Sequence, residues 1–323
     1  MDVTYRPAAL EDAELASDLM SAAYPVMTHD PVVTRFRWVN LRQGHEVGRY
    51  IAEKNGRPIG FLAWLHGPWS EVPDRHCEVE SWLDRAHLDV ELVREMWSWI
   101  GDRATEQGSR LLEAYCAEDE PENLEALAEL GYERERAEKV WELDLRKHGR
   151  RLRDEASVAC KEMYAAGIRL LTVAGWDDAG KWPKLHELNE RTIQDVPHTL
   201  PIVAETFDDF EKRIHAPDRR HDRWWIAVDG ERAVAMSYLK FPPVRGTVWT
   251  GYTCVDREYR GRGIARATKL QTLAQAVELG VPAVFTANDS ENAPMLHINA
   301  ALGYVRRPGW VEHHKGVEMP GNA

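Results

Sequence analysis

Residues 250–270 read TGYTCVDREYRGRGIARATKL: a strand, a basic glycine loop and the start of a helix. The β-branched and aromatic residues up to Val255 suit a pleated strand. Apolar residues spaced three and four apart from Ile264 to Val277 predict an amphipathic helix. Arg260-Gly261-Arg262-Gly263 lies between these elements. Helix-start N–H groups, glycine backbone and forked arginine donors together predict a phosphate-binding loop.

Two common phosphate motifs do not fit this loop. The dinucleotide fingerprint needs a third glycine where Arg266 stands, and the nucleoside-triphosphate loop needs a final Gly-Lys-Ser/Thr, which is absent. The loop does contain R-x-x-G-x-A, as Arg260, Gly263 and Ala265. Downstream come a strand over 281–286, two asparagines, and a helix that ends in Leu-Gly-Tyr at 302–304. A βα unit with surface arginines is the plain structural alternative.

This combination resembles the acyl-coenzyme A (acyl-CoA) loop of the GNAT N-acetyltransferase superfamily, over roughly residues 168–316. The resemblance implies that acetyl-CoA is a co-substrate, with its pantetheine arm paired to the backbone of Cys254 and Val255. It also implies that Asn288 and Asn292 contact the cofactor. The pyrophosphate would be held by the loop itself: Arg260, Gly261, Arg262, Gly263, Ile264 and Ala265.

The first half of the chain repeats the second. Leu83-Asp84-Arg85 precedes Val255-Asp256-Arg257 by 172 residues, and the Leu-Gly-Tyr at 130–132 precedes that at 302–304 by the same interval. Two repeats of this length predict tandem GNAT-like domains of α/β (α+β) class, each a mixed, mainly antiparallel sheet flanked by helices. We place a first domain at 1–149, a linker helix at 150–166 and the acetyl-CoA-binding domain at 167–323.

The two copies differ at the loop. At the 172-residue offset, Arg260 aligns with Leu88 and Gly263 with Glu91. The first copy has no glycine there, and its acidic side chains would repel a pyrophosphate. We therefore predict a degenerate first copy without a working cofactor loop.

Charge and composition narrow the class of protein. The 323-residue chain has a net charge of −12, and residues 1–150 hold 30 acidic and 18 basic side chains. Such an acidic half disfavours nucleic acid and mildly favours a cationic substrate. No apolar run reaches the ~18 residues of a membrane helix, no signal-peptide core is present, and the four cysteines lack metal spacing. We predict a cytoplasmic monomer or homodimer without a metal.

The resemblance implies direct transfer of an acetyl group from acetyl-CoA to an amine of a small molecule or a peptide. A base must take the amine proton, and a backbone N–H near Val255 would stabilise the oxyanion. Many relatives carry a tyrosine acid where this chain has Asn299, which we expect to hold the cofactor arm or a water. Asp195 and Glu312 are the predicted bases, because the family's acceptor site lies between their segments. The other candidates are histidines: His198, His313 and His314.

Two alternatives stay open. A missing tyrosine and a missing strand glutamate would also suit an acyl-CoA-binding regulator without turnover. An oxygen or sulfur acceptor would fit the same fold. Thiol release from acetyl-CoA with a panel of amines distinguishes a transferase from a regulator.

Overall fold

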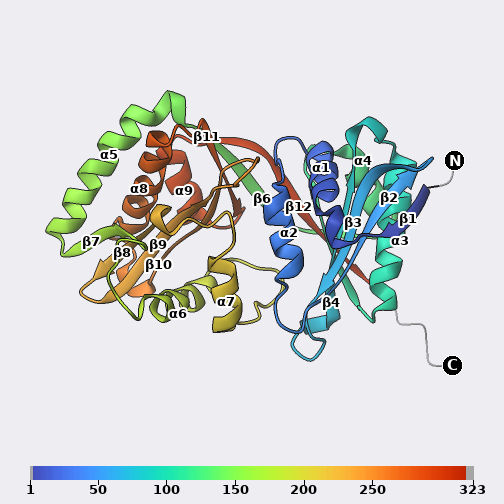
Figure 1. Ribbon diagram of the computed structural model, residues 1–323, viewed down its shortest axis with the longest axis horizontal. Helices are drawn as coiled ribbons and strands as arrows, with labels where there is room; N and C mark the ends of the chain where they lie inside the picture. Colours follow the sequence, from blue (N-terminus) through green and yellow to red (C-terminus); the bar gives the residue numbers. More distant parts are fainter. Residues whose placement is uncertain (1–2, 318–323) are drawn as a thin grey trace.

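The computed structural model describes residues 3–317, whose strands form one twelve-stranded sheet with helices on both faces (Figure 1). The helices are α1 (Ala13–Ala23), α2 (Pro31–Val39), α3 (Val90–Glu106), α4 (Pro121–Glu129), α5 (Leu145–Ala165), α6 (Lys181–Ile193), α7 (Phe207–Ile214), α8 (Ile264–Glu278) and α9 (Ala293–Leu302). The strands are β1 (Val3–Pro7), β2 (Glu46–Lys54), β3 (Arg57–His66), β4 (His76–Leu83), β5 (Leu111–Ala117), β6 (Glu133–Asp144), β7 (Ile168–Thr172), β8 (Trp224–Asp229), β9 (Arg232–Lys240), β10 (Trp249–Val255), β11 (Ala283–Asp289) and β12 (Val305–Gly316). No helix within 3–317 is long and apolar enough to cross a membrane.

The two copies exchange their last strands. The sheet runs β1-β2-β3-β4-β5-β12-β6-β11-β10-β9-β8-β7. Strand β6 of the first copy pairs with β11 of the second, while β12 of the second copy pairs with β5 of the first. Every neighbouring pair is antiparallel except β4 with β5 and β10 with β11. The predicted fold class is confirmed, and the exchange joins both halves into one sheet.

Contacts beyond the sheet also join the copies. Arg136 of β6 forms an ion pair with Asp289 of β11, with 2.9 Å between Nε and Oδ2. The Asp30 carboxylate accepts hydrogen bonds from the backbone N–H groups of Val244 and Arg245 at 2.7 and 2.9 Å. We still propose domain limits at 149 and 167. With these limits, the last strand of each domain pairs with strands of the other domain.

Helix α5 connects the copies and begins five residues before the proposed linker helix. Asp144 caps it at Leu145, because the Asp144 carboxylate accepts from the N–H groups of Arg146 and Lys147 at 2.9 and 3.2 Å. Farther along, the Gln271 side chain of α8 donates to the Ala156 carbonyl at 2.8 Å. Strand β6 and α5 are thus continuous, and α5 packs directly against α8.

Candidate active site

The glycine loop and the first turn of α8 present unpaired backbone donors. Gly261 and Gly263 both have φ of +75°, and no atom lies within 4 Å of where a Cβ would stand on either. Gly263 is the N-cap of α8, and no side chain caps this end. Within residues 3–317, the N–H groups of 261–266 donate to no backbone carbonyl. Such a helix start is suited to bind an anion.

In the first copy, a side chain caps the corresponding helix start. Two residues separate the 3-10 turn at 85–87 from α3, whereas four separate the turn at 257–259 from α8. Asp89 is the N-cap of α3, and its carboxylate accepts from the Leu92 N–H at 3.1 Å. The constant-offset alignment is therefore wrong at this point: Asp89, not Glu91, stands where the second copy has Gly263.

Asp195 is tied to the loop arginines. Its carboxylate accepts from Arg257 Nε at 2.8 Å and also pairs with the Arg260 guanidinium. These contacts hold the pKa of Asp195 below its usual range, against the effect of burial. A carboxylate with both oxygens engaged and a lowered pKa is a poor proton acceptor. We therefore withdraw Asp195 as a base; it braces the loop.

Strands β10 and β11 separate and leave an open slot. Their parallel pairing has one register pair, Trp249 with Phe285. Strand β10 carries a β-bulge between Thr250 and Tyr252. Gly251 stands in the bulge because the Tyr238 ring lies 2.0 Å from where a Cβ would be. Beyond this point, no strand among residues 3–317 pairs with the edge of β10 that faces β11, so an extended ligand can pair with it.

The slot opens onto a cavity between the copies, which we call the central chamber. It has a volume of about 430 Å³ and is lined by α2, β4 and β5 of the first copy and by Lys240, Thr250 and Ala287 of the second. The volume lies within the ~300–1,000 Å³ range of small-molecule sites. The start of α8, the slot and the partly open chamber therefore follow one another.

Residues 182–304 match the family model described as acetyltransferase (GNAT) family. This region is a GNAT domain. The search of curated proteins finds no significant match. The resemblance of this region to the GNAT superfamily, predicted from the loop, is confirmed.

Solved structures extend the likeness to both copies. A tandem GNAT protein from the clavulanic acid biosynthesis pathway superposes with a TM-score of 0.76 at 19% identity, over 99% of this chain and 100% of that one. A GCN5-related N-acetyltransferase from Sphaerobacter thermophilus gives 0.67 at 17% identity, over 99% and 96%. A GNAT-family acetyltransferase from Colwellia psychrerythraea gives 0.59 at 11% identity, over 97% and 99%. The chain therefore has the tandem GNAT fold.

Asn299, at the GNAT tyrosine position, is fully buried beneath the slot. Its amide oxygen accepts from Lys269 Nζ at 2.8 Å, and its amide nitrogen donates to Asn288 Oδ1 at 2.6 Å. Burial lowers the pKa of Lys269 to about 7. This hydrogen bond from Asn299 fixes the position of the Asn288 side chain. Asn292 caps α9, since its side-chain oxygen accepts from the Met295 N–H at 3.4 Å, so its predicted cofactor contact stays a prediction.

Cys254 and Val255 are buried at the end of β10. Burial raises the pKa of the Cys254 thiol to about 12, so this residue is unsuited to be a nucleophile. Arg262 lies over the Tyr259 ring and donates to the Glu258 carbonyl at 3.1 Å. Its predicted contact with the cofactor therefore needs a change of rotamer.

Strand exchange places Glu312 beside the first copy. On β12 it pairs in register with Tyr115 of β5, and its Oε1 lies 2.7 Å from His314 Nε2. Burial would raise the pKa of Glu312, but His314 and Thr199 outweigh this effect and lower it. Glu113, Glu312 and His314 each have a side-chain atom that could bind a metal ion, and these atoms lie within 4.8 Å of one another. An ion pair between the histidine and the carboxylates gives the same arrangement. Glu312 is therefore less suited as a base than predicted.

Glu138 is the residue that the sequence analysis missed. It lies on β6, opposite Asp289 of β11 and Trp310 of β12, and lines the central chamber. Its side chain is exposed to the cavity space, and the surrounding protein with the charges of Asp289 and Glu312 raises its pKa. Because Glu138 belongs to the first copy, only the strand exchange reveals that it reaches the second copy's slot.

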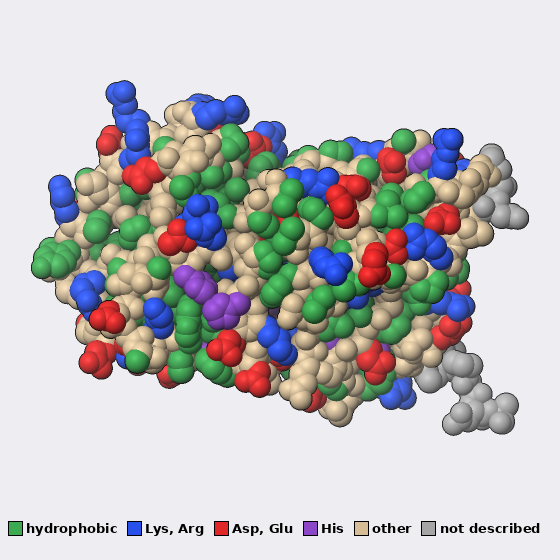
Figure 2. All heavy atoms as spheres, in the orientation of Figure 1, with side chains coloured by type: hydrophobic (Ala, Val, Ile, Leu, Met, Phe, Trp, Pro, Cys, Tyr) green, Lys and Arg blue, Asp and Glu red, His purple; other side chains and the backbone are tan. Residues whose placement is uncertain are grey.

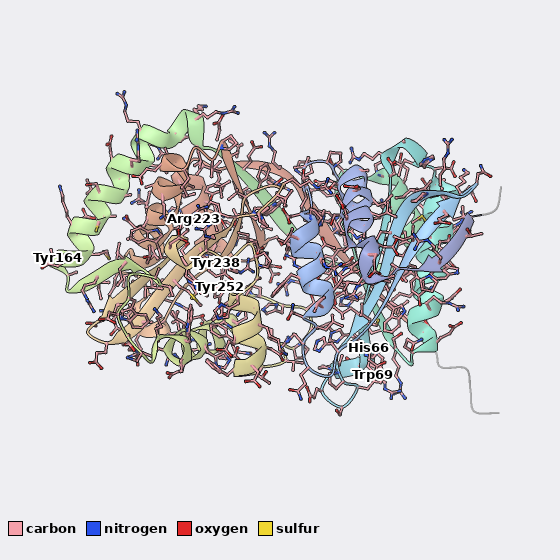
Figure 3. The ribbon with its side chains drawn as sticks, viewed as in Figure 1. His66, Trp69, Tyr164, Arg223, Tyr238 and Tyr252 are labelled. Carbon is pink, nitrogen blue, oxygen red and sulfur yellow. The ribbon has the colours of Figure 1, made fainter. Side chains whose placement is uncertain are left out.

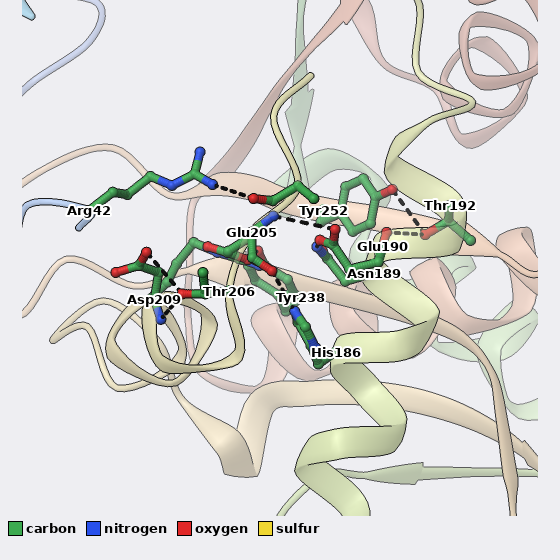
Figure 4. Close-up of polar contacts among 12 residues, drawn as sticks. Arg42, His186, Asn189, Glu190, Thr192, Glu205, Thr206, Asp209, Tyr238 and Tyr252 are labelled. Atoms are coloured by element: carbon green, nitrogen blue, oxygen red, sulfur yellow. Dashed lines mark hydrogen bonds and ion pairs between the residues drawn. The ribbon is translucent and has the colours of Figure 1, made fainter. Parts of the chain in front are cut away.

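The loop before α7 is fixed by a polar network (Figure 4). The Glu205 carboxylate pairs with Arg213 at 2.7 Å, and the Tyr252 hydroxyl donates to Thr192 Oγ1 at 3.1 Å. Arg42 of the first copy donates to the Ala204 carbonyl at 3.3 Å. Tyr238 and Tyr252 lie together beside this network (Figure 3). The loop carries His198 over a second cavity of about 300 Å³, which Glu138 also lines.

Proposed function

We propose that this protein transfers the acetyl group of acetyl-CoA directly to an amine, in the slot of the second copy. The single observation that supports this most is the continuity from the uncapped start of α8, along the open edge of β10, to the central chamber. The residues present fit the co-substrate. The N–H groups of 261–266 would hold its pyrophosphate, and the backbone of β10 near Cys254 and Val255 would pair with its pantetheine amides.

Glu138 is the proposed general base. The acceptor nitrogen attacks the thioester carbon, the C–S bond breaks, and the proton lost by nitrogen passes to Glu138. Its raised pKa makes it a stronger base than an ordinary carboxylate. A backbone N–H at the bulge between Thr250 and Tyr252 is the proposed oxyanion donor, in place of one at Val255. The thiolate can leave without a dedicated acid, since a thiol has a pKa of about 8.5.

The charge of the protein supports a small or peptide amine as acceptor. Carboxylates of β4 and β6 line the chamber together with the cations Arg37 and Lys240, and an ammonium group is drawn to the carboxylates. Figure 2 shows acidic and basic side chains interspersed over one face, without the continuous basic stripe that nucleic acid requires.

Glu138→Gln tests the proposal. We expect kcat to fall by ~10²–10⁴, the usual contribution of a general base, with CoA binding unchanged. Thiol release with a panel of amines measures turnover, and calorimetry measures binding. The matched control is Glu142→Gln on the same strand, whose carboxylate pairs with Arg307 at 2.6 Å. If no amine releases thiol from the wild-type protein although CoA binds, the regulator alternative is correct.

A further inference from the structure

Two tryptophan side chains, which we call the indole pair, give the central chamber an apolar surface. Trp82 of β4 and Trp310 of β12 both line the cavity, and each is partly exposed. Their ring centroids lie 6.0 Å apart in an edge-to-face arrangement, and the Trp310 ring also contacts Tyr24, with 4.9 Å between the centroids. These contacts fix both rings without covering them. The indole pair therefore favours a ligand with an aromatic or apolar body.

The charged side chains of the chamber are compatible with such a ligand. Arg37 is exposed and acts with Arg49 on the Glu80 carboxylate, so these charges offset one another. Burial raises the pKa of Glu78 to about 8 and lowers the pKa of Lys240 to about 7. At pH 7, Glu78 is therefore mostly neutral and Lys240 is only partly charged. The chamber is less polar at this pH than its residue types suggest.

Glu138, the proposed base, is the direct neighbour of Trp310. The two residues pair in register on the antiparallel strands β6 and β12. Side chains paired in this way leave the same face of a sheet, with their Cβ atoms ~5 Å apart. On the other side of β6, Glu138 pairs with Asp289 of β11, one of the two strands that form the slot. The order across the sheet is therefore the slot, Glu138 and then Trp310.

We infer that the acceptor is an amine with an aromatic ring two carbons from its nitrogen, bound with the nitrogen at Glu138 and the ring against the indole pair. This inference rests on the proposed function and narrows its substrate. The linker length follows from the ~5 Å between neighbouring Cβ atoms of a cross-strand pair, because two carbons between nitrogen and ring span about that distance. The nitrogen then lies on the slot side of the ring, where the thioester would be.

Calorimetry on the full-length, CoA-bound chain tests the ring and the linker with defined probes. We expect 2-phenylethylamine to bind about 10- to 100-fold more tightly than ethylamine, the usual gain from burying an aromatic ring. It should also bind more tightly than 1,4-diaminobutane, which tests attraction to carboxylates alone, and than benzylamine and 4-phenylbutylamine, which have shorter and longer linkers. Equal affinity for ethylamine, a preference for the diamine or for another linker length, or no binding in the series overturns the inference.

Tryptophan variants locate the ring. Trp310→Ala and Trp82→Ala should each weaken 2-phenylethylamine binding about 10-fold or more and leave ethylamine binding unchanged. Trp310→Phe, which keeps an aromatic face, should retain the preference. Trp99→Ala is the control, because Trp99 stacks on Tyr5 with 4.3 Å between the ring centroids, outside the chamber. Unchanged CoA binding shows that each variant is folded. Equal weakening of both amines, or an unchanged preference in both alanine variants, counts against the inference.

Thiol release from acetyl-CoA separates this inference from the proposed function. Preferential binding of 2-phenylethylamine without thiol release would sink the transfer reaction and leave the aromatic site standing. Thiol release at equal kcat/KM for 2-phenylethylamine and ethylamine would support transfer and overturn the aromatic site.

Discussion

Helices α3 and α8 occupy equivalent places in the two copies, and their first turns have opposite electrostatic character. Asp89 and Glu91 add negative charge to the start of α3, whereas Gly263 leaves the start of α8 uncapped. Both helices pack on their own sheets, α3 on β3 and β4 and α8 on β8, β9 and β10, so the difference lies in the residues at the first turn. A capping carboxylate stabilises a helix start by about 1 kcal/mol and at the same time fills its anion site. The first copy thus has the more stable helix start, and the second has the one where we propose that the cofactor binds.

Cutting the copies apart should have the largest effect. A fragment of residues 167–323 lacks β5 and β6, so β11 loses one strand partner, β12 loses both of its partners, and long edges are exposed. We expect it to aggregate, whereas residues 133–323, which keep β6 and α5, should be more soluble. Gel filtration compares the two fragments. A stable, fully active monomer of 167–323 would show that strand exchange is dispensable.

Copying the first helix start onto the second should abolish cofactor binding. Gly263→Asp puts a carboxylate at the N-cap where we place the pyrophosphate, and we expect CoA affinity to fall by ~100-fold or more. Calorimetry should find one CoA per wild-type chain. Gly280→Asp is the control, since Gly280 also has φ of +75° but lies beyond the other end of α8. Two CoA sites per chain, or normal binding by the Gly263 variant, would contradict the comparison.

A third difference lies in the cores: α8 of the second copy buries Lys269 completely, whereas the buried residues of α3 in the first copy include no lysine. Burial lowers the pKa of Lys269 from 10.5 to about 7, so between these values the unfolded chain binds more protons and stability rises with pH. This rise approaches ~1.4 kcal/mol per pH unit for one proton. Lys269→Met should remove it and stabilise the protein more at pH 7 than at pH 10. Urea unfolding measures this, with exposed Lys161→Met as the control.

Asn299→Ala should have the smallest effect on activity, with turnover lowered about tenfold or less, or ~1.4 kcal/mol. The amide does not titrate, so the pH profile should keep both limbs. Stability should fall by ~1–3 kcal/mol because Lys269 loses its hydrogen-bond acceptor. The loss of stability caused by Asn299→Ala should be smaller in a Lys269→Met background, because no lysine is then left without its hydrogen-bond acceptor. The first copy has the apolar Leu127 at the position of Asn299. Loss of several orders of magnitude in turnover, with CoA bound, would place Asn299 in the chemistry.

Local patterns predicted the parts that depend on short stretches of chain. The strand, glycine loop and helix at 250–270 follow from periodicity and glycine chemistry, and the structure has them as β10, a loop with two left-handed glycines and α8. The exchange of β6 and β12 could not be predicted, because both arrangements satisfy the same residue pattern. Glu138 was missed for that reason. The bracing role of Asp195 depends on two arginines more than 60 residues away, which no spacing rule reveals.

The strand exchange also determines when, during synthesis, the first copy can complete its part of the sheet. Strand β5 ends at Ala117, yet its neighbour β12 begins at Val305. At ~5–20 residues per second, the ribosome needs roughly 10–40 s to bridge that distance. Until then the first copy has a long open edge, which could recruit strands from other nascent chains. The N-terminal copy must therefore wait until β12 has been synthesised before this edge is covered.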